Sequence, residues 1–164
     1  MNRTMLGRRG FLSGSSALVI VVGSASFATA CSAAAAEPLP IKVHKDPSCG
    51  CCREWAERMN ATGEFLPTLV DQTDMASVKA SLRVPSDLAS CHTTEVAGYV
   101  IEGHVPADDI LRLLNEKPTG VIGLAAPGMP AGSPGMEMPD GRQDRYDVLA
   151  FRADGSATTF SRHG

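Results

Sequence analysis

Apolar and polar positions follow one another in short blocks along the chain, with a period of two in some blocks and about 3.6 in others. The pattern predicts strands over residues 41–44 and 66–70, with a helix between them that begins near Cys49. The apolar face of this helix consists of Cys52, Trp55, Ala56 and Met59. A second helix is predicted after its capping residue Asp74 and ends by Pro85. This order of strand, helix, strand and helix predicts an α/β domain.

The sequence pattern in the second half of the chain predicts one more helix and further strands. Residues 96–101 are predicted as a strand, and Glu102-Gly103 as the turn that follows it. Pro106 suits the first turn of a helix that Pro118 ends. Near the end of the chain, residues 146–152 and 157–161 flank Asp154-Gly155 as a predicted hairpin. The strands are therefore expected to form a central mixed sheet with helices beside it.

A long segment rich in glycine, proline and methionine occupies residues 118–142. A connection with so many breakers is either disordered or built around a function. Met129 lies between Gly128 and Pro130, while Met136 and Met138 would share one face of an extended segment with Glu137 pointing away. Methionines often only fill apolar surface. In this segment they also predict a loop whose thioethers close over a site.

The first 36 residues have the composition of an export signal. They carry three arginines and no acid, a short apolar run at 17–22 and a small-residue end at 34–36. Residues 7–12 are similar to a twin-arginine signal, although an ordinary secretory signal is the alternative. Cys31 offers a lipoprotein cleavage site, a less favoured outcome because Ala28 is atypical there. The sequence predicts that residues 1–36 are removed and that residues 37–164 form a single periplasmic domain.

The composition makes some function classes improbable. The whole chain carries a net charge of −3, and loss of the leader would remove only positive charge. Aromatic residues make up 5% of the chain, and no basic stripe accompanies them. Nucleic acid binding is therefore not expected. No segment after residue 36 has the length and apolarity of a membrane-spanning helix.

Cysteines give the most specific chemical signal in the sequence. Cys49, Cys51 and Cys52 lie at the start of the first predicted helix, and Cys91 follows 39 residues later. Exported proteins usually oxidise their thiols into structural disulfides, but adjacent Cys51 and Cys52 are too close for an ordinary bridge. The helix N-terminus favours thiolate at Cys49 and Cys51. The cluster therefore predicts a soft-metal or redox site.

The other candidate ligands decide which metal the site favours. Thiolate combined with thioether selects cuprous copper, whereas zinc prefers thiolate and imidazole. His104 is a candidate ligand after a predicted turn, and the alternative is a solvated loop histidine. His92 is adjacent to Cys91, so an extended backbone would point the two side chains to opposite sides. We expect Cys91 to be the ligand, and His92 either a ligand or its hydrogen-bonding support. His44 and His163 have no soft partner nearby in the sequence.

Four separate segments form a recognisable set, namely 45–52 (KDPSCGCC), 90–93 (SCHT), 98–106 (GYVIEGHVP), and 127–130 (PGMP) continuing to 135–138 (GMEM). Together and in this order they resemble the CopG-type family of periplasmic copper-resistance proteins. The resemblance implies a thioredoxin-like fold and a cysteine-rich site that binds copper and interconverts its oxidation states. It also implies the metal ligands, which would be Cys49, Cys51, Cys52 and Cys91, supported by His104, Met129 and Met136.

Two departures separate this chain from thioredoxin enzymes. A third cysteine lies inside the Cys49–Cys52 spacing, and no proline precedes Thr93 where those enzymes place a cis-proline. The leading interpretation is therefore a periplasmic protein that sequesters copper or processes its redox state, with copper ions as partners. A copper exporter or a periplasmic chaperone is the candidate for metal exchange. The sequence leaves open whether a copper oxidoreductase turns the metal over.

Two other interpretations compete with copper binding. In a thiol-disulfide oxidoreductase, Cys49 would attack the substrate disulfide and Cys52 would resolve the mixed disulfide, with Cys51 and Cys91 as a second pair. In a structural zinc or iron–sulfur site the methionines would be idle, and the cysteine spacing does not match paired two-residue gaps.

Overall fold

The structure is a computed structural model that describes residues 37–164. The predicted leader and Cys31 lie outside the described residues, so the signal peptide, the export route and the lipid attachment stay predictions. Among the helices of residues 37–164, none has both the length and the apolar character needed to cross a membrane.

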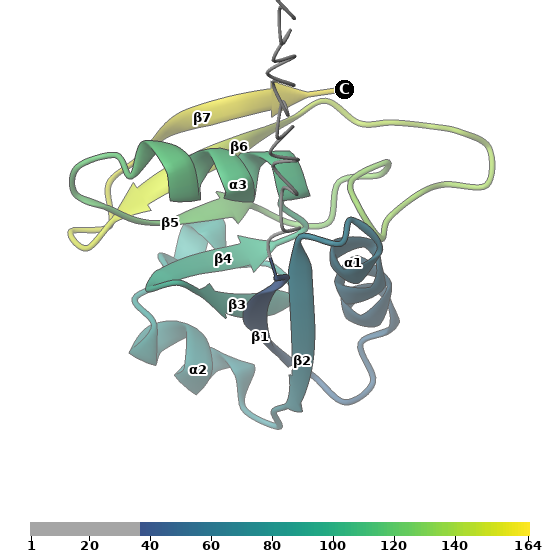
Figure 1. Ribbon diagram of the computed structural model, residues 1–164, viewed down its shortest axis with the longest axis horizontal. Coiled ribbons are helices and arrows are strands. Elements are labelled where there is room, and N and C mark those ends of the chain that lie inside the picture. Colours follow the sequence, from purple (N-terminus) through teal and green to yellow (C-terminus); the bar gives the residue numbers. More distant parts are fainter. Residues whose placement is uncertain (1–36) are drawn as a thin grey trace, which may run out of the picture. The chain divides into compact units, whose positions relative to one another are not determined.

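A mixed sheet of seven strands organises the described residues, in the order β2-β1-β3-β4-β5-β6-β7 (Figure 1). β1 and β2 are parallel, as are β4 and β5, and the other neighbours are antiparallel. The strands are β1 (Leu39–Lys45), β2 (Phe65–Asp71), β3 (His92–Val96), β4 (Tyr99–Gly103), β5 (Val121–Ala126), β6 (Tyr146–Arg152) and β7 (Ala157–His163). The helices are α1 (Gly50–Ala61), α2 (Met75–Ser81) and α3 (Ala107–Glu116), with a short 3₁₀ turn at Ser86–Leu88.

This architecture confirms the predicted α/β class and the central mixed sheet with flanking helices. The first four strands, in the order β2-β1-β3-β4 with α1 joining β1 to β2, are compatible with the thioredoxin-like topology that the resemblance implied.

Helices cover both faces of the sheet. α1 and α3 share one apolar cluster, in which Trp55 and Met59 of α1 and Leu113 of α3 pack with strand residues such as Ile101. The predicted inward face of α1 is confirmed, since Cys52, Trp55, Ala56 and Met59 are all buried. The indole N–H of Trp55 donates to the carbonyl of Val105 at 3.0 Å and so joins α1 to the segment before α3. α2 lies on the opposite face (Figure 1), near a second cluster around Phe151.

Three local predictions were wrong. Residues 96–101 are not one strand, because Ala97 and Gly98 adopt left-handed backbone angles (φ 45° and 85°) and turn β3 into β4. Glu102 and Gly103 are not a turn, since both belong to β4. The long loop is also shorter than predicted, because residues 121–126 form β5. That strand is buried on both faces, so its sequence is a continuous apolar run and does not alternate between apolar and polar residues.

Candidate metal centre

The start of α1 presents three cysteines in one turn of backbone. Asp46 shapes the approach, because its carboxylate accepts the Ser48 backbone N–H at 2.8 Å and its carbonyl accepts the Cys49 N–H at 3.0 Å. Cys49 is the N-cap residue, and no side chain caps the first turn. The free N–H groups and the dipole of this helix end therefore favour negative charge near Cys49 and Cys51.

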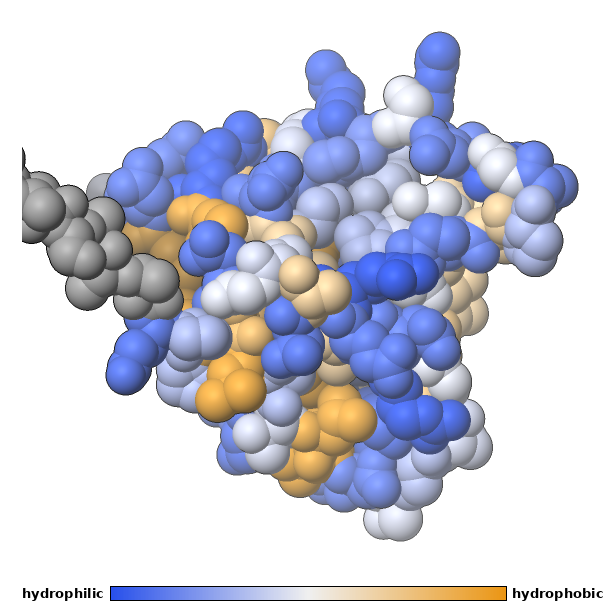
Figure 2. Space-filling model, turned by 45° about the vertical axis from the view of Figure 1, so that its right-hand side comes forward, coloured by the Kyte–Doolittle hydropathy of each residue, from blue (hydrophilic) through white to orange (hydrophobic). Residues whose placement is uncertain are grey.

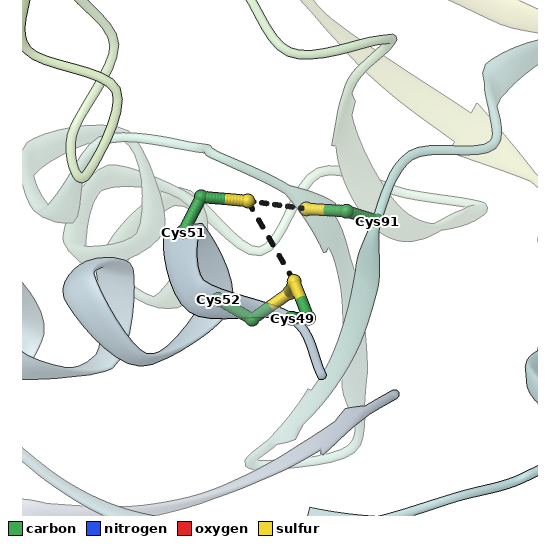
Figure 3. Close-up of side chains that lie close together, drawn as sticks. All are labelled: Cys49, Cys51, Cys52 and Cys91. Atoms are coloured by element: carbon green, nitrogen blue, oxygen red, sulfur yellow. Dashed lines mark hydrogen bonds between the residues drawn. A yellow bond between two sulfur atoms is a disulfide. The ribbon is translucent and has the colours of Figure 1, made fainter. Parts of the chain in front are cut away.

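Cys49 and Cys52 form a disulfide across that first turn, with their Cα atoms 5.5 Å apart (Figure 3). Cys52 is completely buried, so this bond ties the helix start to the interior. The side chain of Cys51 leaves the helix about 100° around its axis from that of Cys52, and its Sγ lies 3.6 Å from Cys49 Sγ. Its thiol is free and partly exposed. The four predicted cysteines can therefore act as thiolates together only after the disulfide is reduced.

Cys51 is the point at which the sulfur atoms converge. Its Sγ lies 3.6 Å from Cys49 Sγ, 3.9 Å from Cys91 Sγ and 4.0 Å from Met129 Sδ. Figure 3 shows the Cys51 and Cys91 sulfurs pointing toward each other from α1 and from the segment before β3. The Sγ atoms of all four cysteines lie within 4.8 Å of one another. Side chains from the start of α1, from the segment before β3 and from the segment after β5 thus meet at one thiol.

His104 faces the same cluster with a defined nitrogen. Its Nδ1 lies 2.8 Å from the carbonyl oxygen of Pro134, which can only accept a hydrogen bond. Nδ1 therefore carries the proton and donates it, which leaves the Nε2 lone pair directed at Cys91 Sγ, 3.0 Å away. A carbonyl that fixes the far nitrogen in this way is the usual arrangement behind a metal-binding histidine.

His92 also reaches Cys91, although the alternation of an extended backbone predicted that the two side chains would point to opposite sides. Cys91 lies just before β3, so the side-chain alternation of an extended strand does not apply to this pair. His92 Nδ1 is 3.3 Å from Cys91 Sγ, and its ring packs on Trp55 with ring centroids 4.6 Å apart. The side chain is completely buried, and its Nε2 has no hydrogen-bond partner among the described residues. The sequence signal for this residue was only its position beside a cysteine.

Burial controls the protonation of this cluster. Desolvation, followed by the neighbouring Cys51 thiol, raises the pKa of Cys91 to about 12. Desolvation lowers the pKa of His92 well below its usual value, and it also lowers that of His104. Both imidazoles are therefore neutral at pH 7 and available as ligands. Cys91 is a thiol until a cation replaces its proton, so metal binding there releases that proton.

The segment between β5 and β6 lies beside α1 (Figure 1). It is held there by the His104–Pro134 hydrogen bond and by an ion pair at 2.9 Å between Arg58 of α1 and Glu137. Gly135 packs so closely that a Cβ on it would lie 2.5 Å from the Trp55 backbone nitrogen. Glu137 therefore points to α1, the helix that carries the cysteines.

The two predicted loop methionines differ in their relation to the cysteines. Met129 is 54% exposed, with its sulfur beside Cys51, whereas a methionine that fills apolar surface would be covered. Figure 2 shows a mainly polar face with small separate apolar groups, and the other large exposed apolar side chains of residues 37–164 are Leu66 and Leu69 of β2. Met136 is half-buried and, within the described residues, makes no comparable sulfur contact with a cysteine.

The remaining histidines lie elsewhere. His44 bonds to Glu95 at 2.8 Å and to Gln72 at 3.2 Å, and His163 contacts Asp109 at 2.6 Å. Neither belongs to the groups of close donors, which are Cys49, Cys51, Cys52 and Cys91 on one side and Cys91, His92 and His104 on the other.

The donor chemistry fits a soft cation. The described residues bring together thiols, one thioether and neutral imidazoles, and no carboxylate belongs to either group of close donors. Hard cations such as Mg²⁺ and Ca²⁺ prefer oxygen ligands, whereas thiolate and thioether together favour Cu(I).

Comparisons with known proteins agree with this chemistry. A family model described as "Protein of unknown function, DUF411" matches residues 88–136. The solved structure named "Copper resistance protein copG- Form 1" is 46% identical, covering 77% of this chain and 98% of that chain, with a TM-score of 0.71. "Copper resistance protein copG- Form 2" is 45% identical, covering 78% and 100%, with a TM-score of 0.72. No curated protein matches the chain.

Proposed function

The chain belongs to the CopG family of copper resistance proteins, and from this premise we propose that it binds cuprous copper as its cargo and sequesters it or processes its redox state in the periplasm. The observation that carries the proposal is the convergence of three sulfurs on the Cys51 thiol. A thiol surrounded by sulfur, at a partly exposed helix start, suits capture of a soft cation.

The proposed ligands follow from the distances at the cluster. Cys51, Cys91, His104 and Met129 supply free donors while the Cys49–Cys52 disulfide is intact. Cys49 and Cys52 would join them after reduction, and Met136 would add a thioether from the same loop segment. Copper loading should therefore depend on the redox state of the chain, with more copper retained by the reduced protein.

The disulfide also supports a redox role beside storage. Two Cu(II) ions reduced to Cu(I) take two electrons, and the Cys49 and Cys52 thiols supply them by forming a disulfide and releasing two protons. A dithiol reductant must then return the pair to thiols before another cycle. Storage requires no such turnover, so repeated Cu(II) reduction in the presence of a dithiol separates the two roles.

The same disulfide favours a second candidate function, thiol-disulfide exchange with a protein substrate. A disulfide at Cys49-x-x-Cys52 with a partly exposed first sulfur is the arrangement used by redox dithiols. In that case the metal-free reduced protein should reduce a test disulfide, and copper should inhibit it by occupying the sulfurs. A copper-specific protein should show slow reduction even without metal.

Location and partners belong to the proposal as well. The basic, acid-free leader supports export of residues 37–164 to the periplasm. A copper exporter or periplasmic chaperone would exchange metal with the site through the exposed Met129 side.

The test is metal competition on the isolated domain. Residues 37–164, reduced and kept anaerobic, are offered Cu(I) and Zn(II) together, and retained metal per protein is measured by elemental analysis. We expect copper to be retained in preference to zinc. Met129→Leu should weaken copper retention with near-normal folding, because leucine keeps the apolar volume but lacks the sulfur. Met138→Leu, in the same segment, is the matched control. Preferential zinc retention would contradict the proposal.

A further inference from the structure

A buried carboxylate lies behind the cysteine cluster and takes no part in it. Glu102 of β4 is completely buried on the α2 face of the sheet. Its Oε1 accepts from Lys79 Nζ at 2.5 Å and from the Ser90 backbone N–H at 2.6 Å, and its Oε2 accepts from Thr93 Oγ1 at 2.7 Å. Lys79 also donates to Thr93 Oγ1 at 3.0 Å. Residues from α2, β3, β4 and the segment before β3 therefore share one hydrogen-bond network.

A contribution to folding stability does not by itself explain why the Lys79–Glu102 ion pair is buried. Burying an ion pair costs desolvation energy that its attraction barely offsets, and well-packed apolar residues are often as stable or more so. Lys79 is 14% exposed and Glu102 not at all, so both charges are largely desolvated. A buried network of this kind does fix the geometry of the groups that it bonds.

Ser90 connects this hydrogen-bond network to the cysteine cluster. Its hydroxyl donates to the Gly128 carbonyl, and Ser90 and Gly128 pair as an isolated parallel bridge. Ser90 directly precedes Cys91, and Gly128 directly precedes Met129. The two sulfur-bearing residues therefore start from neighbouring, bonded backbone positions. Both sulfurs approach the same thiol, that of Cys51, at 3.9 Å and 4.0 Å.

We propose that Glu102 and Ser90 are positioning residues of the copper site. Glu102 fixes the backbone of Ser90, and Ser90 holds the Met129 segment beside Cys91, so thioether and thiol reach Cys51 together. This inference rests on the proposed copper binding for its purpose. The Ser90–Gly128 contact itself lies within the metal-free protein, and it can be tested without metal.

The first test replaces Ser90 by alanine, which removes the hydroxyl donor to Gly128 but keeps the backbone N–H that Glu102 accepts. Hydrogen–deuterium exchange of the metal-free protein should become faster in residues 127–130. Cu(I) affinity should fall by about tenfold, the lower range seen when a metal ligand loses its supporting partner. Ser81→Ala is the control, because it removes an equivalent hydroxyl-to-carbonyl bond, to Val78 at 2.7 Å on the surface of α2.

A double-mutant cycle separates positioning from general stability. If Ser90 acts through Met129, Ser90→Ala should cost no further affinity in a Met129→Leu background. Additive losses would overturn the inference, and so would unchanged exchange in residues 127–130. Wild-type protein that retains no copper would instead refute the proposed function. The hydrogen–deuterium exchange experiment would still decide whether Ser90 holds the segment of residues 127–130.

The second test keeps or removes the carboxylate acceptor without leaving an unpaired charge. The double variant Lys79→Met with Glu102→Gln retains an oxygen for the Ser90 N–H, whereas Lys79→Met with Glu102→Leu does not. Both remove the buried ion pair at similar volume. We expect near wild-type Cu(I) affinity in the glutamine variant and about a tenfold loss in the leucine variant. Equal affinity of the two would overturn the role given to Glu102.

Discussion

Gly135 is the position at which the methionine-bearing segment rests on α1. Its φ is +79°, and a Cβ there would lie 2.5 Å from the Trp55 nitrogen and 2.9 Å from its Cα. These are helix backbone atoms at the centre of α1, so they cannot give way as a flexible side chain would. Gly135→Ala should therefore lift the segment from the helix and carry Pro134 away from His104.

Two costs set the loss of folding stability expected for Gly135→Ala, and a separate consequence is weaker metal binding. A left-handed backbone angle costs a residue with a Cβ about 1–2 kcal/mol. The overlap with α1 adds about 1–3 kcal/mol, the usual cost of overpacking. Loss of the Pro134 carbonyl frees the His104 ring from its fixed tautomer, and loss of such a partner lowers metal affinity by about 10–100-fold.

A matched control lies in the same segment. Gly141 has a φ of +73°, and a Cβ on it would meet no atom within 4 Å. Gly141→Ala therefore has the same backbone cost without the collision. The free energy of unfolding is measured by urea denaturation, and Cu(I) affinity by anaerobic competition with a chromophoric chelator.

We expect both alanine variants to lose stability, with the larger loss in Gly135→Ala. Only Gly135→Ala should lose copper affinity. Wild-type affinity in Gly135→Ala would refute the idea that contact with α1 holds the segment over the site. An equal loss in Gly141→Ala would show that general loosening of the segment is the cause.

Three further predictions follow from the same geometry. Unfolded residues 37–164 should show two reactive thiols before reduction and four after it, because Cys49 and Cys52 are bonded; four before reduction would contradict the disulfide. Cys51→Ser should lower bound copper, measured by elemental analysis, more than it lowers any disulfide reductase activity, and the reverse ranking would favour the exchange enzyme. Burial depresses the pKa of His92 in the folded state, so protons favour unfolding below the unfolded-state pKa of about 6.5. Acidification from pH 7.5 to 5.5 should therefore cost about 1.4 kcal/mol through His92, and His92→Phe should show a correspondingly smaller pH dependence in urea denaturation.

Local sequence patterns correctly predicted the features that depend on residues close to one another in the chain. The buried face of α1, the Asp74 cap and the hairpin at Asp154-Gly155 all follow from short spacings. β5 was missed because breakers surround it and both of its faces are buried, so no alternation marks it.

The candidate site depended more on contacts across the sheet. The sequence identified Cys51, Cys91 and Met129 as candidates, and the structure brings their sulfurs together. His92 could not be assigned, because its position relative to Cys91 depends on where β3 begins. Glu102 looked like a turn residue, and only the pairing of β3 with β4 shows that it is buried.

We propose that the thiols of Cys51 and Cys91, the thioether of Met129 and the imidazole of His104 together hold Cu(I). X-ray absorption at the copper edge of anaerobically loaded residues 37–164 tests it most directly, with the same measurement on His104→Phe. We expect Cu(I) with mainly sulfur neighbours and a nitrogen contribution that disappears in the variant. A first shell of oxygen and nitrogen, or a nitrogen contribution that persists unchanged in the variant, would contradict it.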